Sequence, residues 1–154
     1  MTLQDLGNIG ELVAAIATVA TLFYLARQVA MSNRFAKAEA WRSRFSEFTS
    51  INAAYGVNPI FYHAMRKLGE GGTMADLNGD EQALANSWII SMLQIYEQLF
   101  REVRTGILDP AALDEHPGAS IFFFPFFKEQ WSYYRAILLP RFSEFLEEKY
   151  KLLN

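Results

Sequence analysis

The sequence predicts an all-α protein, in which a single N-terminal transmembrane helix continues into a small cytoplasmic helical bundle. One observation is the segment 9–30, IGELVAAIATVATLFYLARQVA, which is almost wholly apolar. Another is that apolar residues beyond it recur at steps of three and four, the period of amphipathic helices, without competing β alternation. We expect two parts: a membrane anchor, residues 1–30, and a helical domain, residues 31–154.

The apolar segment is just long enough to cross a bilayer. Residues 12–26 carry no charge, yet at about 1.5 Å per residue they cover only about 22 Å of a hydrocarbon layer about 30 Å thick. The required length is reached from Ile9 to Val29, provided that Glu11 lies near one headgroup layer and Arg27 snorkels toward the other. We predict insertion; the alternative is a buried helix in a soluble oligomer.

Positive charge gathers on one side of this segment. All fourteen Lys and Arg residues lie at or after Arg27. Because cytoplasmic flanks of membrane helices carry an excess of Lys and Arg, we expect the N-terminus outside and the domain in the cytoplasm. The basic side chains nearest the span are predicted to contact anionic lipid headgroups. These are Arg27, Arg34, Lys37, Arg42 and Arg44.

One stripe of the span carries small side chains and is predicted to pack against another membrane helix, since small residues let helix backbones approach closely in lipid. The stripe consists of Gly10, Ala14, Ala17, Thr18 and Thr21. The expected partners, besides lipids, are transmembrane helices of a hetero-complex or of a homo-oligomer; the alternative is that these residues only fill the anchor. Glu11 is a candidate intramembrane carboxylate, with a solvated interfacial group as the alternative.

The anchor is expected to continue as helix through an amphipathic stripe, with a break at Ser32–Asn33 as the alternative. The stripe consists of Phe35, Ala38, Trp41, Phe45, Phe48 and Ile51. The segment 56–59, Gly-Val-Asn-Pro, should end this helix and start a short second one over 60–68. Residues 69–80 are predicted to be a polar loop. Their glycines do not indicate a phosphate-binding loop, because no Gly-Lys-Ser/Thr ending follows them.

The longest helix of the domain is predicted over 80–104, with Asp80 as its N-cap and Gly106 at its C-terminal end. Its wide apolar face predicts a central position. A further helix should begin at Asp109-Pro110 and end near Glu115. Two last helices are expected over 128–138 and 140–152, the latter with Pro140 in its first turn.

The most unusual stretch is 121–127, IFFFPFF. Contiguous apolar residues cannot all point inward from one helix, so we expect part of it to be exposed and to contact a partner or the membrane. The alternatives are core packing and the lining of a pocket. The residues concerned are Phe122, Phe123, Phe124, Phe126 and Phe127.

Composition and motifs point away from catalysis. The chain has no cysteine, which excludes disulfides and thiolate chemistry, and a net charge of −3 argues against nucleic-acid binding. Neither histidine, His63 or His116, lies in a metal-ligand pattern, and serine-hydrolase motifs are absent. We therefore predict no enzyme activity, no metal and no cofactor.

Several stretches resemble a widespread family of small uncharacterised bacterial proteins: 10–29, the basic run up to Trp41, RTGILD at 104–109, and WSYYR…PRFSEFL within 131–146. The resemblance implies one N-terminal membrane helix followed by a helical cytoplasmic domain, and hence a single-pass protein of the bacterial inner membrane. It implies no activity. The phenylalanine run departs from the more polar segment usual there, which suggests a contact particular to this chain.

The function expected from these observations is that of a non-catalytic, membrane-anchored accessory or scaffold subunit. It would pack on a larger integral-membrane complex, for which respiratory and photosynthetic types are candidates. One alternative is a membrane-tethered sensory or ligand-binding domain with an aromatic pocket for an apolar molecule. The other alternative is a homo-oligomeric scaffold.

Overall fold

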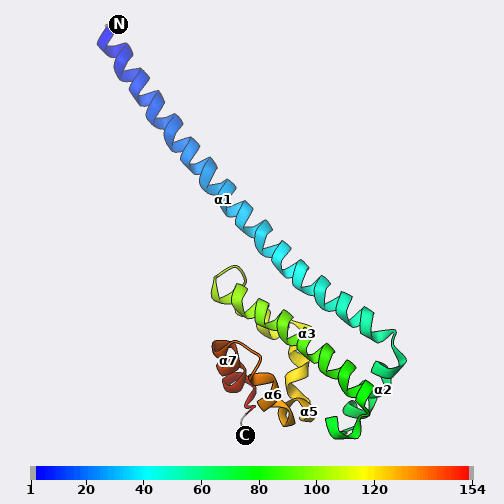
Figure 1. Cartoon of the computed structure of the whole chain (residues 1–154). Helices are drawn as coiled ribbons and strands as arrows, with labels where there is room; N and C mark the ends of the chain where they lie inside the picture. The colour runs from blue at the N-terminus through cyan, green and yellow to red at the C-terminus, as the bar shows by residue number, and fades with distance from the viewer. Residues whose placement is uncertain (1–2, 153–154) are drawn as a thin grey trace. The chain divides into compact units, whose positions relative to one another are not determined.

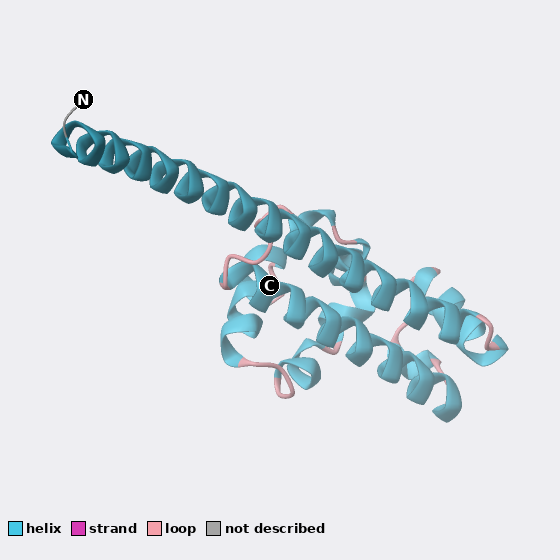
Figure 2. Cartoon of the chain, turned by 90° about the horizontal axis from the view of Figure 1, so that it is seen from above, coloured by secondary structure: helices cyan, strands magenta, loops and turns pink. Residues whose placement is uncertain are grey.

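The computed structural model describes residues 3–152 and is all-α, with a long N-terminal helix followed by shorter helices (Figure 1). Residues 3–152 contain no β-strand, as the colouring of Figure 2 makes clear. The chain divides into two compact units, Met1–Glu39 and Ala40–Asn154. The predicted anchor lies within the first unit.

Helix α1 extends over Leu3–Gly56 without interruption. The alternative of a break at Ser32–Asn33 is wrong, because both residues are helical. Serine and asparagine are only modestly poorer helix formers than alanine, so two of them do not stop a long helix. Within the apolar segment, the hydroxyls of Thr18 and Thr21 donate to the carbonyls four residues earlier, each at 2.8 Å, so neither needs an outside partner.

The predicted stop at residues 56–59 is confirmed. Helix α2, Pro59–Gly69, begins at an N-cap in which Asn58 Oδ1 accepts the backbone N–H of Ile60 at 2.9 Å. Proline suits this first turn because its missing N–H would have no helical partner there. The predicted polar loop follows; it contains a 3₁₀ turn, η1 (Met74–Asp76), and buries Met74.

Helix α3, Gly79–Arg104, is the longest helix that lies entirely in the second unit. Its N-cap is Asn78 rather than the predicted Asp80: Asn78 Oδ1 accepts the Glu81 N–H at 3.0 Å, and Glu81 Oε2 accepts the Asn78 N–H at 2.9 Å. This reciprocal capping box satisfies two N–H groups at once, which a cap at Asp80 would not do. The predicted end is confirmed, because Gly106 adopts a φ of +74° just beyond the helix.

The C-terminal third is more broken than predicted. The helix expected over 128–138 is wrong: the chain leaves helical geometry at Gln130 (φ −93°, ψ 6°), which separates two one-turn helices. A turn between two short helices leaves the apolar period almost unchanged, so the pattern could not reveal it. The elements are α4 (Ala112–Glu115), η2 (Pro117–Phe123), α5 (Pro125–Glu129), α6 (Trp131–Arg135) and α7 (Pro140–Tyr150).

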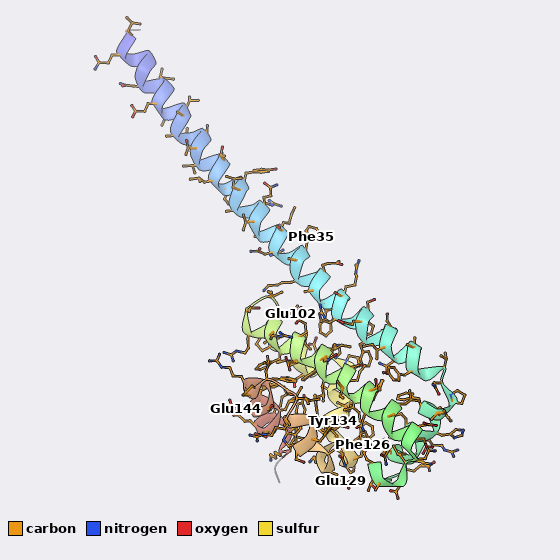
Figure 3. All side chains as sticks on the ribbon, in the orientation of Figure 1. Phe35, Glu102, Phe126, Glu129, Tyr134 and Glu144 are labelled. Atoms are coloured by element: carbon orange, nitrogen blue, oxygen red, sulfur yellow. The ribbon has the colours of Figure 1, made fainter. Side chains whose placement is uncertain are left out.

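The core of the second unit is built around α3, as predicted. This helix buries an apolar face that runs from Ala85 to Leu99 and packs against α2, α4 and η2. The labelled side chains of Phe126 and Tyr134 lie within this packed region (Figure 3). The second unit therefore has a hydrophobic core of its own.

Candidate membrane and partner-contact surfaces

The apolar segment of α1 has no cover. Every residue of the first unit whose side chain the structure describes is exposed, including Leu12, Ile16 and Phe23, the last with 72% of its surface accessible. Among residues 3–152, α1 is the one helix long and apolar enough to cross a membrane, with a mean hydropathy of 1.9 in its best window and none of that window buried. The core helix of a soluble protein would be largely buried. α1 is therefore a candidate membrane span.

The predicted packing stripe lies on this uncovered helix. Gly10, Ala14, Ala17, Thr18 and Thr21 are all exposed, and a Cβ added at Gly10 would meet nothing within 4 Å. Glu11 is exposed as well. The stripe is thus open to a neighbouring helix, and nothing in the described part of the chain competes for it.

The predicted basic cluster divides into two groups. Arg27, Arg34, Lys37 and Arg42 are exposed and stand outside the ion pairs found in residues 3–152. The prediction of lipid contact does not fit the fifth residue, Arg44.

The side chain of Arg44 is turned into the second unit and is only 19% exposed. Its Nη1 pairs with Glu47, one turn along α1, and its Nε lies 3.3 Å from Glu102 Oε1 on α3. Charge counting along the sequence could not reveal this, because the carboxylate of Glu102 comes from a distant helix. Arg44 therefore links α1 to α3 through an ion pair and does not face lipid.

His116 forms the centre of a buried ring cluster between α1, α3 and η2. The imidazole is 2% exposed, and its centroid lies 5.3 Å from Phe48, 6.1 Å from Trp41 and 6.2 Å from Tyr96. Its Nδ1 accepts the Gly118 N–H at 3.1 Å, so the neutral ring carries its proton on Nε2. Burial lowers the pKa of His116, opposed by the backbone carbonyl of Arg44. The histidine therefore acts as a neutral packing group.

A second buried node lies at Tyr96 of α3. Its hydroxyl donates to the carbonyl of Leu113 and accepts from the hydroxyl of Tyr150 at 2.8 Å, so it links α3, α4 and α7. Burial raises the pKa of Tyr96, which keeps the hydroxyl protonated and able to donate. These bonds hold the short C-terminal helices on the central one; a hydroxyl with both partners satisfied is a structural feature.

The phenylalanine run splits between core and surface. Phe123 and Phe124 are 71% and 36% exposed, which confirms that part of the run is on the surface. The prediction of a partner or membrane contact does not fit Phe122, Phe126 and Phe127, because all three are buried. The run is not one helix: η2 ends at Phe123 and Pro125 starts α5, so neighbouring rings point in different directions.

The buried aromatic side chains pack closely against one another and do not line a pocket. Phe127 stacks on Tyr134 with centroids 5.4 Å apart, and Phe122 lies 4.5 Å from Tyr150. A cavity of about 330 Å³ does lie between α6 and α7, but no aromatic residue lines it. Its lining is Ser132, Arg135, Ala136, Leu138, Pro140, Ser143 and Glu144. This arrangement does not favour the aromatic pocket for an apolar molecule.

Metal binding has no evident site in the part of the chain that the structure describes. Residues 3–152 contain no group of three or more His, Asp or Glu side chains placed to hold a metal ion. No protein-family model, curated protein or solved structure matches this chain. Its function must therefore be argued from the surfaces themselves, above all from α1.

Proposed function

We propose that this chain is a non-catalytic, single-pass membrane subunit whose α1 helix anchors it and packs against other transmembrane helices. The observation that carries the proposal is the apolar segment of α1, which is helical throughout and uncovered on every side. Soluble monomers rarely expose contiguous apolar patches larger than a few hundred Å². A helix satisfies all its backbone hydrogen bonds internally, so lipid is a suitable environment for this segment.

A need for partner helices follows from the weakness of the anchor. Its seven strongly apolar residues contribute roughly −2 to −4 kcal/mol on an insertion scale, partly offset by Thr18 and Thr21. Packing against a second helix adds van der Waals contact that lipid alone does not supply, provided that small side chains permit close approach. The exposed stripe around Ala14 and Ala17 has the required shape.

The domain is proposed to lie on the cytoplasmic face of a bacterial inner membrane. Four exposed cations support this orientation: Arg27, Arg34, Lys37 and Arg42. Each contributes about 1 kcal/mol of attraction when it lies near an anionic leaflet. Within residues 1–154, every Lys and Arg lies at Arg27 or beyond it, on one side of the proposed span.

Labelling of single cysteines is expected to report this orientation. The chain has no native cysteine, so Leu3→Cys and Lys151→Cys each introduce one thiol. In intact cells an impermeant maleimide should label the first variant and not the second, whereas both should react after the membrane is permeabilised. Labelling of Lys151→Cys alone in intact cells would show that the topology is the reverse of the one proposed.

Native mass spectrometry tests the proposed role itself. After extraction in a mild detergent, the chain of 17.6 kDa is expected to run on a native gel as part of a larger protein assembly. Mass spectrometry of the same gel band should identify the other components. A monomer that retains a small apolar molecule would contradict the proposal and favour a ligand-binding domain. A monomer with nothing bound would also contradict it, once crosslinking before extraction has shown that detergent did not separate the subunits.

A further inference from the structure

The exposed residues of α1 contain a longer pattern than the stripe of small side chains. From Gly10 onward, steps of four and three residues alternate without a break, and every position reached is exposed. We name these positions the α1 seam: Gly10, Ala14, Ala17, Thr21, Tyr24, Gln28, Met31, Phe35 and Ala38. A mean step of 3.5 residues is the spacing of the side chains that meet where two helices wrap around each other with a left-handed twist.

The side chains of the seam change character along the helix. Up to Thr21, inside the proposed span, they are small, which permits close approach of two backbones in lipid. Beyond Arg27 they include Met31 and Phe35, whose exposure to water is unfavourable and is relieved only by burial against a partner. Figure 3 shows the labelled Phe35 projecting from α1, and 70% of its surface is exposed.

The two aromatic rings of the seam supply much of its exposed apolar area. An aromatic side chain buries ~150–250 Å², so Tyr24 and Phe35, which are 64% and 70% exposed, supply roughly 200–300 Å² per chain. The seven other seam positions add to this along a contact of nine residues. Met31, which is 50% exposed, is the largest apolar residue among them.

The charges that flank the seam are complementary between two parallel copies. Arg34 directly precedes the seam residue Phe35, and Glu39 directly follows Ala38. In a parallel pair of helices, the residue before one seam position faces the residue that lies five places later on the other helix, after the next seam position. Arg34 and Glu39 are five residues apart, so each Arg34 would face the Glu39 of the other copy.

Nothing within the described chain satisfies this pair. Residues five apart lie on different faces of one helix, so Arg34 and Glu39 cannot pair within a single copy. Neither takes part in the ion pairs found in residues 3–152. Glu39 is also the one acidic residue between Arg27 and Arg44, which makes the match specific to this register.

We propose that the α1 seam binds a second copy of this chain in parallel, with Arg34 of each copy paired with Glu39 of the other. The inference rests on the proposed function, because a membrane anchor gives both copies the same direction. A two-fold interface needs a surface that complements itself. The Arg34–Glu39 match meets this need, because the two-fold axis produces the same ion pair twice. A helix of another protein would not require that match within this chain.

Charge reversal tests the pairing. In full-length protein reconstituted in mild detergent, Arg34→Glu or Glu39→Arg alone should raise the dimer dissociation constant roughly three- to tenfold, because like charges then face each other twice. The double variant R34E/E39R should restore the wild-type constant. An equal mixture of the two single variants should form heterodimers in preference to either homodimer. The control is Lys37→Glu, which makes the same charge change as Arg34→Glu but at a position that does not flank the seam in this pairing, and it should leave the constant within twofold of wild type.

Disulfide formation tests the geometry in native membranes. Because the chain lacks cysteine, Met31→Cys and Ala38→Cys should each give disulfide-linked dimers on mild oxidation. Asn33→Cys, which lies on the side of the helix away from the seam, should not. Equal crosslinking at Ala38 and Asn33, or failure of the double charge variant to recover, would overturn the proposal.

The outcomes separate this inference from the membrane role. If the chain stays in carbonate-washed membranes but forms no dimer, the second copy is excluded and the anchor remains. If seam cysteines crosslink to a different protein, the second copy is again excluded, whereas the subunit role gains support. If the wild-type chain appears in the carbonate supernatant, both proposals fail.

Discussion

Phe122→Ala is expected to lower the free energy of unfolding of the second unit by about 3–5 kcal/mol, whereas Phe123→Ala should change it by less than about 0.5 kcal/mol. The two phenylalanines are neighbours in the same 3₁₀ segment, but Phe122 is fully buried and Phe123 is 71% exposed. Phe122 lies 4.9 Å from Tyr96 and 5.3 Å from Phe127, centroid to centroid. Alanine there would leave a cavity in the middle of the aromatic core.

The comparison is best made on the full chain in mild detergent, by urea unfolding followed with near-ultraviolet circular dichroism. That signal reports packed aromatic rings and is insensitive to the helix content of α1. A similar loss for both variants would mean that the run 121–127 does not divide into a buried and an exposed part. A negligible loss for Phe122→Ala would mean that the aromatic core is not closely packed.

This pair of residues also marks where prediction from the sequence stops. Periodicity indicated α1, α2, α3 and α7 correctly, because each carries an apolar stripe long enough to establish its period. It could not decide which rings of 121–127 face inward, since a run of similar residues has no period. The decision is made by Pro125, which starts a new helix two residues after η2 ends.

Contacts distant in sequence were the other limit. His116 lies in no ligand motif of the sequence, which gives no sign that it lies against Trp41 and Phe48 of α1. Arg44 was grouped with the basic residues that follow the span, yet it pairs with Glu102, more than fifty positions later. In both cases the local sequence does not reveal the partner, because the two residues are brought close only when residues 40–56 of α1 pack on the core of the second unit.

The capping of α3 shows a smaller error of the same origin. Asn78 and Asp80 are both good N-cap residues, and propensity alone hardly separates them. The choice is made by Glu81, whose carboxylate bonds the Asn78 N–H and also accepts from Lys67 Nζ at 2.7 Å. The hydrogen bond from Lys67, followed by that from Asn78, lowers the pKa of Glu81. The cap thus depends on a lysine from the preceding helix.

Replacing Ile16 and Leu22 together by lysine is expected to release the chain from the membrane. Each apolar residue contributes about −0.3 to −0.6 kcal/mol to insertion, whereas a lysine at the centre of a span opposes it by about 2.5–3.5 kcal/mol. The double change therefore opposes insertion by roughly 6–8 kcal/mol, which exceeds the few kcal/mol that the whole anchor supplies. Both side chains are exposed on α1, so the substitutions should leave the fold of the second unit unchanged.

The measurement is the distribution of the chain between pellet and supernatant after a carbonate wash. The control carries the same two added charges on exposed positions of α1 beyond the span, Ala36→Lys with Ser43→Lys, and should stay in the pellet with the wild type. If I16K/L22K also remains in the pellet, contacts other than lipid around the apolar segment retain the chain. In that case the uncovered helix belongs to a protein interface, and its apolar surface is satisfied by side chains of another polypeptide.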